Sequence, residues 1–275
     1  MPTQPELYER FRALHQRPQC FIMPNAWDAT SALVLGEAGF EALGTSSAAI
    51  AASLGRLDGR HAISREEHIG NAQLIGRMSG LAVNGDFEDG YGATPEAVAA
   101  TVRAAIAAGL AGIGVEDTSG DPDHPIRDFD EAVARVAAAA RAAKGRILLT
   151  GRTDNFLHGR ADLDDTIRRL TAFAEVGADV LYAPYLPDLD AVAAVVRAVA
   201  PKPVNLLIGT AQGPLPLAEL QRAGVKRISL GVALYTRLMA ELREVARQLA
   251  GGDLLPAARG MPYGEIKRMI AEAGR

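Results

Sequence analysis

Three acidic residues stand together in segment 84–92, where an apolar run gives way to glycine-rich sequence: Asp86, Glu88 and Asp89. The preceding run, 81–83, is typical of the end of a buried strand, and the glycines around the acids predict a tight turn. Strand alternation would place Asp86 and Glu88 on one face and turn Asp89 away. Two convergent carboxylates are donors that Mg²⁺ prefers, although a solvated acidic loop would have the same composition.

Elements that could hold such a site recur along the chain. Apolar runs of strand length lie at 20–23, 40–43, 81–83, 112–115, 147–149, 179–182, 204–208 and 227–230. Helical periodicity separates most of them, at 4–16, 95–108, 129–143, 162–175 and 189–200. This alternation predicts an α/β fold, most economically an eight-stranded (β/α)8 TIM barrel. A doubly wound open sheet is the alternative, but the first predicted strand lacks the glycine-rich turn of dinucleotide-binding folds.

The predicted helices end regularly, and the chain continues beyond the last strand. Glycines that follow a helical segment and precede a strand predict left-handed helix ends at Gly39, Gly109, Gly177 and Gly224. Because 275 residues suit one barrel and no linker divides them, we expect residues 1–275 to form a single domain. Residues 234–275 contain two more helical segments, 234–249 and 263–273, which we interpret as a C-terminal helical extension for docking or subunit contact.

Composition favours small-molecule chemistry in the cytoplasm. The chain is 48% hydrophobic and 23% charged, and its net charge is -4 with the two signs interspersed, so we expect no nucleic-acid or anionic-membrane partner. Cys20 is the only cysteine, which excludes an intrachain disulfide and a cysteine-rich zinc site. We also expect neither a secretory signal nor a membrane span, because no apolar run is long enough.

Polar residues collect where the predicted strands end, and in a barrel these ends meet on one face. Bare carboxylates there would repel one another, so a divalent cation is favoured, and an arginine can hold a substrate carboxylate bidentately. Taken one at a time, these residues also have structural explanations: the acids could cap helices or lie in solvated loops, and the arginine could form a structural ion pair. The candidates are Thr45, Ser46 and Ser47; Asp86 and Glu88; Glu116 and Asp117; Arg152 and Asp154; Tyr182 and Tyr185; and Asn205.

Four segments carry a family resemblance: 45–58, 86–92, 114–117 and 151–154. In this order they resemble the motifs of the isocitrate lyase and phosphoenolpyruvate mutase superfamily, over about residues 21–235. The resemblance implies an eight-stranded barrel that binds Mg²⁺, with Mn²⁺ as a possible substitute, and a small 2-oxo acid or dicarboxylate. It also implies a homo-oligomer, commonly a tetramer in which the last barrel helix packs into a neighbour.

The resemblance also implies a role for each matching residue. The oxyanion-holding turn falls on Ser46 and Ser47, next to Thr45, with serine in place of the family's glycine at position 47. The substrate-carboxylate arginine is Arg152, and the strand-seven asparagine of the lyase branch falls on Asn205. Strand six departs from the family, because it ends in Tyr182 where lyases tend to have a glutamate and mutases a histidine; the Tyr182 hydroxyl could still donate to a substrate oxygen. Asp86 would serve both metal and substrate, and Glu116 would be catalytic as well as metal-binding. The metal-site acids fall on Asp58, Asp86, Glu88 and Glu116, with Glu88 where aspartate is more common.

The departures from the family select the reaction. Isocitrate and 2-methylisocitrate lyases carry a Lys-Lys-Cys-Gly-His-like loop after strand four, whereas segment 118–125 has no cysteine. Phosphonate-forming mutases have a Lys- and Asn-bearing loop there, which is also missing. Decarboxylation of oxaloacetate needs only a metal, an oxyanion turn and a carboxylate clamp. We therefore predict a Mg²⁺-dependent carbon–carbon lyase acting on a small 2-oxo dicarboxylate, oxaloacetate decarboxylation being the simplest case.

Several alternatives stay open. An enzyme like isocitrate or 2-methylisocitrate lyase, or like phosphonopyruvate or phosphoenolpyruvate mutase, would use the same metal apparatus. A barrel that binds 2-oxo acids without catalysis is a rival from another class. A sugar-phosphate aldolase or isomerase would need a phosphate-binding turn near Gly209 and Gly231. His124 is a candidate proton donor, although a surface histidine would have the same setting.

Overall fold

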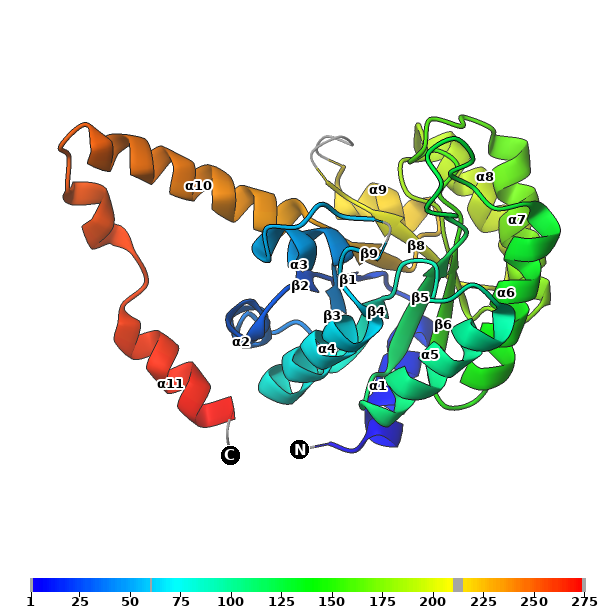
Figure 1. Cartoon of the computed structure of the whole chain (residues 1–275), viewed down its shortest axis with the longest axis horizontal. Helices are drawn as coiled ribbons and strands as arrows, with labels where there is room; N and C mark the ends of the chain where they lie inside the picture. Colours follow the sequence, from blue (N-terminus) through cyan, green and yellow to red (C-terminus); the bar gives the residue numbers. More distant parts are fainter. Residues whose placement is uncertain (1, 60, 210–214, 274–275) are drawn as a thin grey trace.

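The chain folds into one continuous parallel sheet with helices on its outside (Figure 1). The structure is a computed structural model that describes residues 2–59, 61–209 and 215–273. Within them the strand order is β1-β9-β8-β7-β6-β5-β4-β3-β2. The strands are β1 (Phe21–Met23), β2 (Asn25–Ala26), β3 (Ala42–Thr45), β4 (Ala82–Asp86), β5 (Gly112–Glu116), β6 (Leu148–Arg152), β7 (Val180–Tyr182), β8 (Val204–Leu207) and β9 (Arg227–Ser229).

The barrel-like, TIM-barrel-like architecture is confirmed, but the count of eight strands is wrong: the described sheet has nine. The additional strand is β2, which follows the first predicted strand (20–23) and is separated from β1 by Pro24, because proline has no N–H to donate to a neighbouring strand. On one side of it β1 pairs with β9, and on the other β2 pairs with β3. The Pro24 carbonyl still accepts from Gly44 N at 2.9 Å, so this short stretch joins the two ends of the sheet.

The helices include every predicted segment, with ends within one residue of the prediction, and others that were not predicted. They are α1 (Gln4–Gln16), α2 (Ala29–Glu37), α3 (Ser47–Ser53), α4 (Arg65–Ser79), α5 (Pro95–Ala107), α6 (Phe129–Ala143), α7 (Leu163–Glu175), α8 (Leu189–Val199), α9 (Leu217–Arg222), α10 (Ala233–Ala250), the 3-10 helix η1 (Leu255–Arg259) and α11 (Tyr263–Ala273). The predicted left-handed stops are confirmed, with φ of 88° at Gly39, 90° at Gly109, 112° at Gly177 and 87° at Gly224.

One end of the barrel is closed by α1. Phe11 is fully buried, and it packs with Leu7 and Leu14 of the same helix against the first residues of three strands, Ala42, Ala82 and Leu148. The packing of this apolar face removes water from the N-terminal ends of the strands. Any cavity in the barrel must therefore open at the other end, where the strands finish.

The C-terminal extension leaves the barrel and returns to it. Figure 1 shows α10 projecting away from the sheet, and none of its residues is buried. The chain then comes back through α11, where Met269 is buried and Arg268 pairs with Glu37 of α2. Residues 274 and 275 of the predicted extension lie outside the described part. Among the described residues, no helix combines the length and hydropathy that a membrane crossing requires.

Candidate active site

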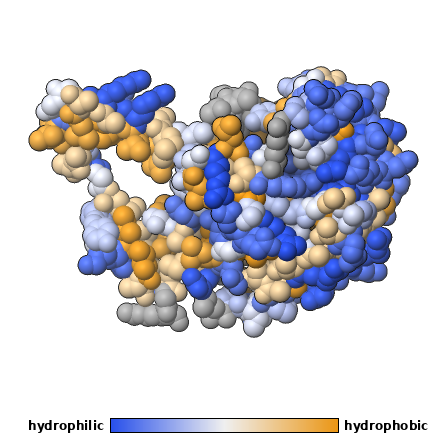
Figure 2. All heavy atoms as spheres, in the orientation of Figure 1, coloured by the Kyte–Doolittle hydropathy of each residue, from blue (hydrophilic) through white to orange (hydrophobic). Residues whose placement is uncertain are grey.

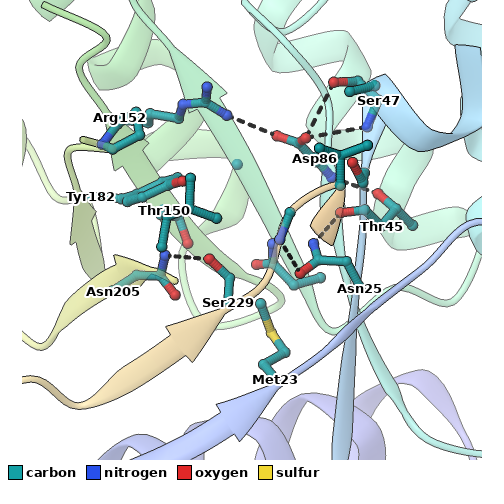
Figure 3. A pocket seen from close by; sticks show the side chains of 18 of the residues that line it. Met23, Asn25, Thr45, Ser47, Asp86, Thr150, Arg152, Tyr182, Asn205 and Ser229 are labelled. Atoms are coloured by element: carbon teal, nitrogen blue, oxygen red, sulfur yellow. Dashed lines mark hydrogen bonds and ion pairs between the residues drawn. The ribbon is translucent and has the colours of Figure 1, made fainter. Parts of the chain in front are cut away.

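The predicted site residues meet at the carboxyl ends of the strands, in two adjoining cavities. Ser47, Asp58 and Arg152 line both cavities. Glu88 and Glu116 line only the second one. Figure 3 shows the first, with Arg152 and Asp86 facing each other across it. Its lining contains Thr45, Ser46, Ser47, Asp58, Asp86, Arg152, Tyr182 and Asn205.

Asp86 is the last residue of β4 and is held by its neighbour β3. Its backbone N–H donates to Thr45 Oγ1 at 2.8 Å, and the Thr45 side chain, fully buried, also contacts His68 Nε2 at 3.1 Å. Asp86 Oδ2 accepts from Ser47 N and Ser47 Oγ, both at 3.3 Å. Thr45 therefore acts on the site by fixing the backbone that carries Asp86.

Arg152 ends β6 and joins three carboxylates. Its Nη1 lies 3.3 Å from Asp86 Oδ1 and 3.1 Å from Glu116 Oε2, and its Nε donates to Asp154 Oδ1 at 2.6 Å. Burial lowers the pKa of Arg152, but Asp154 and Glu116 raise it well above its usual value, so the guanidinium stays charged. Burial is also the main cause that raises the pKa of Glu116, with Arg152 acting against it.

The turn after β6 is fixed by Asp117, which is buried outside both cavities. Asp117 accepts from Thr153 Oγ1 at 2.7 Å, from Asp154 N at 2.9 Å and from Arg169 Nη1 at 3.1 Å. The acid that follows Glu116 in the sequence is thus an anchor for the backbone beside Arg152. Asp154 positions Arg152 directly, through Nε.

Glu88 reaches the site by a different route from the one that alternation predicted. The strand ends at Asp86, and Glu88 takes a φ of 45°, so the alternation of faces does not extend to it. Glu88 Oε2 accepts from His61 N at 3.1 Å and Oε1 from Tyr91 Oη at 3.2 Å. Burial raises the pKa of this carboxyl.

Asp58 belongs to the loop that follows α3 and covers the site. The residue as a whole is exposed, but its carboxylate lies near Gly59 N–H and Ser47. Loss of hydration at that carboxyl, followed by the negative charge of Asp86, raises its pKa, while Gly59 N–H and Ser47 act to lower it. Asp58 lines both cavities together with Ser47, whose hydroxyl donates to Asp86.

Asp89 lines neither of these two cavities and pairs with three basic side chains. It binds Arg127 Nη2 at 2.8 Å, Arg135 Nη2 at 3.0 Å and His61 Nε2 at 2.7 Å. Although burial raises the pKa of Asp89, the hydrogen bond from His61 and the charge of Arg135 bring it below its usual value. His61 stood out in no sequence pattern, yet it ties the loop carrying Asp58 to the segment carrying Glu88.

The predicted oxyanion turn begins α3. Ser46 Oγ accepts from Ala49 N at 3.3 Å, so its side chain caps the helix, and Ser47 N–H points to Asp86. The N-terminal end of a helix favours negative charge in front of it. What this turn offers to a bound molecule is therefore backbone N–H groups and the Ser47 hydroxyl.

A polar layer lies beneath Arg152 (Figure 3). Asn205 Nδ2 donates to Ser229 Oγ at 2.9 Å, and Thr150 and Tyr182 complete the layer toward β6 and β7. Burial raises the pKa of Tyr182, which keeps its hydroxyl protonated. Arg227, which the sequence analysis missed, also lines this cavity. The signal was present, as an arginine inside an apolar run of strand length.

Other candidates have structural surroundings. His124 lines neither cavity, and its carbonyl accepts from Ser119 Oγ at 2.5 Å. His158, which stood out in no sequence pattern, lines the second cavity. The segment around His124 nevertheless borders that cavity through Asp121 and Pro125.

The donor set suits Mg²⁺ although the described residues contain no group of three or more His, Cys, Asp or Glu in ligating geometry. Arg152 Nη1 lies between Asp86 and Glu116, and so holds these carboxylates around a positive charge. Mg²⁺ usually takes only one or two protein carboxylates and keeps its other positions for water and substrate. Asp86 could supply one such carboxylate, and Asp58 and Glu116 lie near enough to supply a second or to hold metal-bound water.

Comparisons with known proteins identify the family of the chain. The family model for phosphoenolpyruvate phosphomutase matches residues 11–250. The chain belongs to the isocitrate lyase and phosphoenolpyruvate mutase superfamily. An uncharacterised Mycobacterium tuberculosis protein is 34% identical over 95% of this chain and 96% of its own. An oxaloacetate decarboxylase from Chromohalobacter salexigens is 29% identical over 85% of this chain and 82% of its own.

Solved structures of the superfamily superpose over nearly the whole chain. A Burkholderia cenocepacia protein described as a lyase or mutase has a TM-score of 0.93 and 44% identity, covering 98% of this chain and 96% of its own. Oxaloacetate acetylhydrolase, solved with its product oxalate, has a TM-score of 0.86 and 26% identity, covering 98% and 95%. These superfamily members are named for different reactions, so membership alone leaves the reaction open.

Proposed function

We propose that this superfamily member is a Mg²⁺-dependent carbon–carbon lyase acting on a small 2-oxo dicarboxylate, with oxaloacetate decarboxylation as the simplest case. The observation that carries the proposal is the position of Arg152 Nη1, 3.3 Å from Asp86 and 3.1 Å from Glu116 at the mouth of a polar cavity. The proposed carboxylate clamp and the oxygens proposed to bind the metal would thus lie within a few ångströms of each other.

Each residue has a defined task in this proposal. Asp86 would hold Mg²⁺, with Asp58, Glu88 and Glu116 around it directly or through water. When bound, Mg²⁺ would act as a Lewis acid toward the keto oxygen of the substrate. Arg152 would bind the carboxylate next to that keto group, since its planar fork matches carboxylate geometry.

The remaining steps need no cysteine. The bond between the methylene carbon and the remote carboxylate breaks, CO₂ leaves, and its bonding electrons pass into the enolate of pyruvate. The Ser47 N–H group and hydroxyl, which donate to Asp86 Oδ2 in this structure, would also be near the negative oxygen that develops. Water then protonates the methylene carbon, and pyruvate is released. This path suits a chain whose segment 118–125 has no thiol.

The test compares pyruvate formation from oxaloacetate with Mg²⁺ in the presence and absence of the protein. We expect enzyme-dependent turnover that EDTA abolishes and that the Arg152→Met variant loses mainly through KM. If pyruvate appears no faster than with free Mg²⁺, oxaloacetate decarboxylation is wrong. Isocitrate, 2-methylisocitrate and phosphonopyruvate, tested in parallel, would then distinguish the other superfamily reactions from a barrel that only binds.

We also propose that the protein is a homo-oligomer that uses α10 as its contact. The exposed side chains of this projecting helix include Leu238, Leu242 and Leu249. Figure 2 shows apolar surface gathered over the projecting C-terminal part. An exposed apolar stripe of this kind marks an interaction surface. Light scattering should give a multiple of the 28.9 kDa chain for the native protein and a smaller mass for Leu242→Glu; a monomeric native protein would contradict this.

A further inference from the structure

Arg227 is a buried guanidinium in the wall of the cavity that holds Arg152 and Asp86. It begins β9 and is 2% exposed. Its Nε donates to Asn205 Oδ1 at 2.7 Å and its Nη2 to Thr150 Oγ1 at 3.0 Å, while Nη1 has no partner among the described residues. Both of its acceptors are neutral.

The other arginines buried in the described part of the chain have carboxylate partners. Arg135 pairs with Asp89, Arg169 with Asp117 and Asp165, and Arg152 with three acids. No ion pair to a described residue is found for Arg227. A buried charge without a counter-charge is costly, so the protein retains here a cation that an incoming anion would stabilise.

The surroundings do not neutralise this charge. Burial lowers the pKa of Arg227 to about 9, which leaves the guanidinium positive at neutral pH. His15 lies on the N-terminal side of it, and burial, followed by the charge of Arg227, lowers the pKa of that imidazole to about 3. His15 is therefore neutral at pH 7 and supplies neither sign of charge.

Arg227 also fixes the donors around it. Because Arg227 Nε donates to Asn205 Oδ1, the amide of Asn205 is oriented so that its Nδ2 donates to Ser229 Oγ. The hydroxyls of Thr150 and Ser229 lie on the same layer of the cavity (Figure 3). The layer thus combines one positive charge with several neutral hydrogen-bond donors, a composition suited to a carboxylate.

The distance between the two arginine layers matches a short dicarboxylate. Thr150, the acceptor for Arg227, precedes Arg152 by two residues on β6. Two residues of a parallel strand span about 6.6 Å. A four- or five-carbon chain with a hydrogen bond at its far end covers such a distance.

We propose that Arg227 is the centre of a second anion subsite, which receives the remote carboxylate of a dicarboxylate whose other end is held by Arg152. This inference rests on the proposed function only for the end of the substrate that Arg152 and the metal would bind. A monocarboxylate would leave the buried guanidinium unpaired, so the subsite selects dicarboxylates over monocarboxylates.

The test uses binding in the presence of Mg²⁺, measured by isothermal titration calorimetry. L-malate and L-lactate present the same chelating end and differ in the remote carboxylate, whereas oxalate reports on the metal end by itself. Native protein should bind L-malate about ten- to a hundredfold more tightly than L-lactate. Arg227→Met should remove this preference and leave oxalate affinity unchanged, and Arg227→Lys should keep part of it.

The outcomes separate this inference from the proposed function. If oxalate and L-malate both fail to bind the native protein, the metal and 2-oxo acid site is wrong, and the subsite that depends on it falls with it. If oxalate binds but Arg227→Met retains the preference for L-malate, only the subsite is wrong. Thermal unfolding adds an independent readout, since Arg227→Met should keep or raise Tm in the absence of ligand. If Arg227→Met does not fold, the ratio of the L-malate and L-lactate affinities measured on Arg227→Lys decides.

Discussion

Two acids three residues apart, Asp86 and Asp89, should respond in opposite ways to the same substitution by asparagine. Asp89 is the shared partner of Arg127, Arg135 and His61, and its side chain is 6% exposed. Asp86 is more open, and its partner Arg152 keeps Glu116 and Asp154 when Asp86 is neutralised. One acid therefore holds the fold of this region, and the other serves the site.

The magnitudes follow from these contacts. Asp89→Asn leaves Arg135, whose side chain is 1% exposed, with no carboxylate among the described residues. Breaking a buried pair in this way costs about 3–5 kcal/mol, equivalent to a fall in Tm of roughly 10 °C for a chain of this size. Asp86→Asn removes one partly exposed contact at 3.3 Å, which is worth at most about 1 kcal/mol.

Activity should show the reverse pattern. Asp86→Asn should lower Mg²⁺-dependent pyruvate formation by more than about a hundredfold, because the proposed metal loses its central oxygen donor. Asp89→Asn should retain activity at temperatures well below its Tm. Asp130→Asn, on the exposed first turn of α6, is the control for loss of one negative charge.

Thermal unfolding followed by circular dichroism and a coupled pyruvate assay measure both quantities on the same samples. The reasoning is refuted if Asp89→Asn melts with the native protein, or if Asp86→Asn keeps its Mg²⁺-dependent activity while remaining folded. Either result would mean that the two carboxylates do not divide structural and chemical roles as their contacts indicate.

Further predictions concern the support of Asp86 and the binding of metal. Thr45→Val keeps the shape of a fully buried side chain but leaves Asp86 N–H without its acceptor; it should cost about 1–3 kcal/mol in urea unfolding and weaken Mg²⁺ binding. Thr101→Val, at a buried threonine whose hydroxyl donates to Ala97 O, is the matched control and should leave Mg²⁺ binding unchanged. The pKa values of Asp58 and Glu88 are raised in the folded protein. Without metal, the free energy of unfolding should therefore decrease as pH rises from the pKa values of these acids in the unfolded chain through their higher pKa values in the folded protein. Because Mg²⁺ needs the ionised forms, its stabilising effect on Tm should be larger at pH 8 than at pH 5; an equal effect at both would contradict their place around the metal.

The sequence by itself determined the elements and the motif positions. Segments 4–16, 129–143 and 263–273 are helices with the predicted bounds, and Gly109 and Gly177 end their helices in the left-handed conformation. These features depend on periodicity and backbone conformation within a few residues, so local sequence is sufficient to predict them. The run of acids after 81–83 likewise indicated where the site would lie.

Only the tertiary structure decided what each charged residue does. Asp86, Asp89 and Asp117 all follow strand-like runs, yet one faces the cavity and two anchor arginines that lie elsewhere in the chain. An arginine inside the apolar run at 227–230 was visible in the sequence, but its lack of an ion pair to any described residue was not, because that depends on which side chains surround it after folding. Pairing of charges joins residues tens of positions apart, and the desolvation that makes such pairs matter exists only once the barrel has closed.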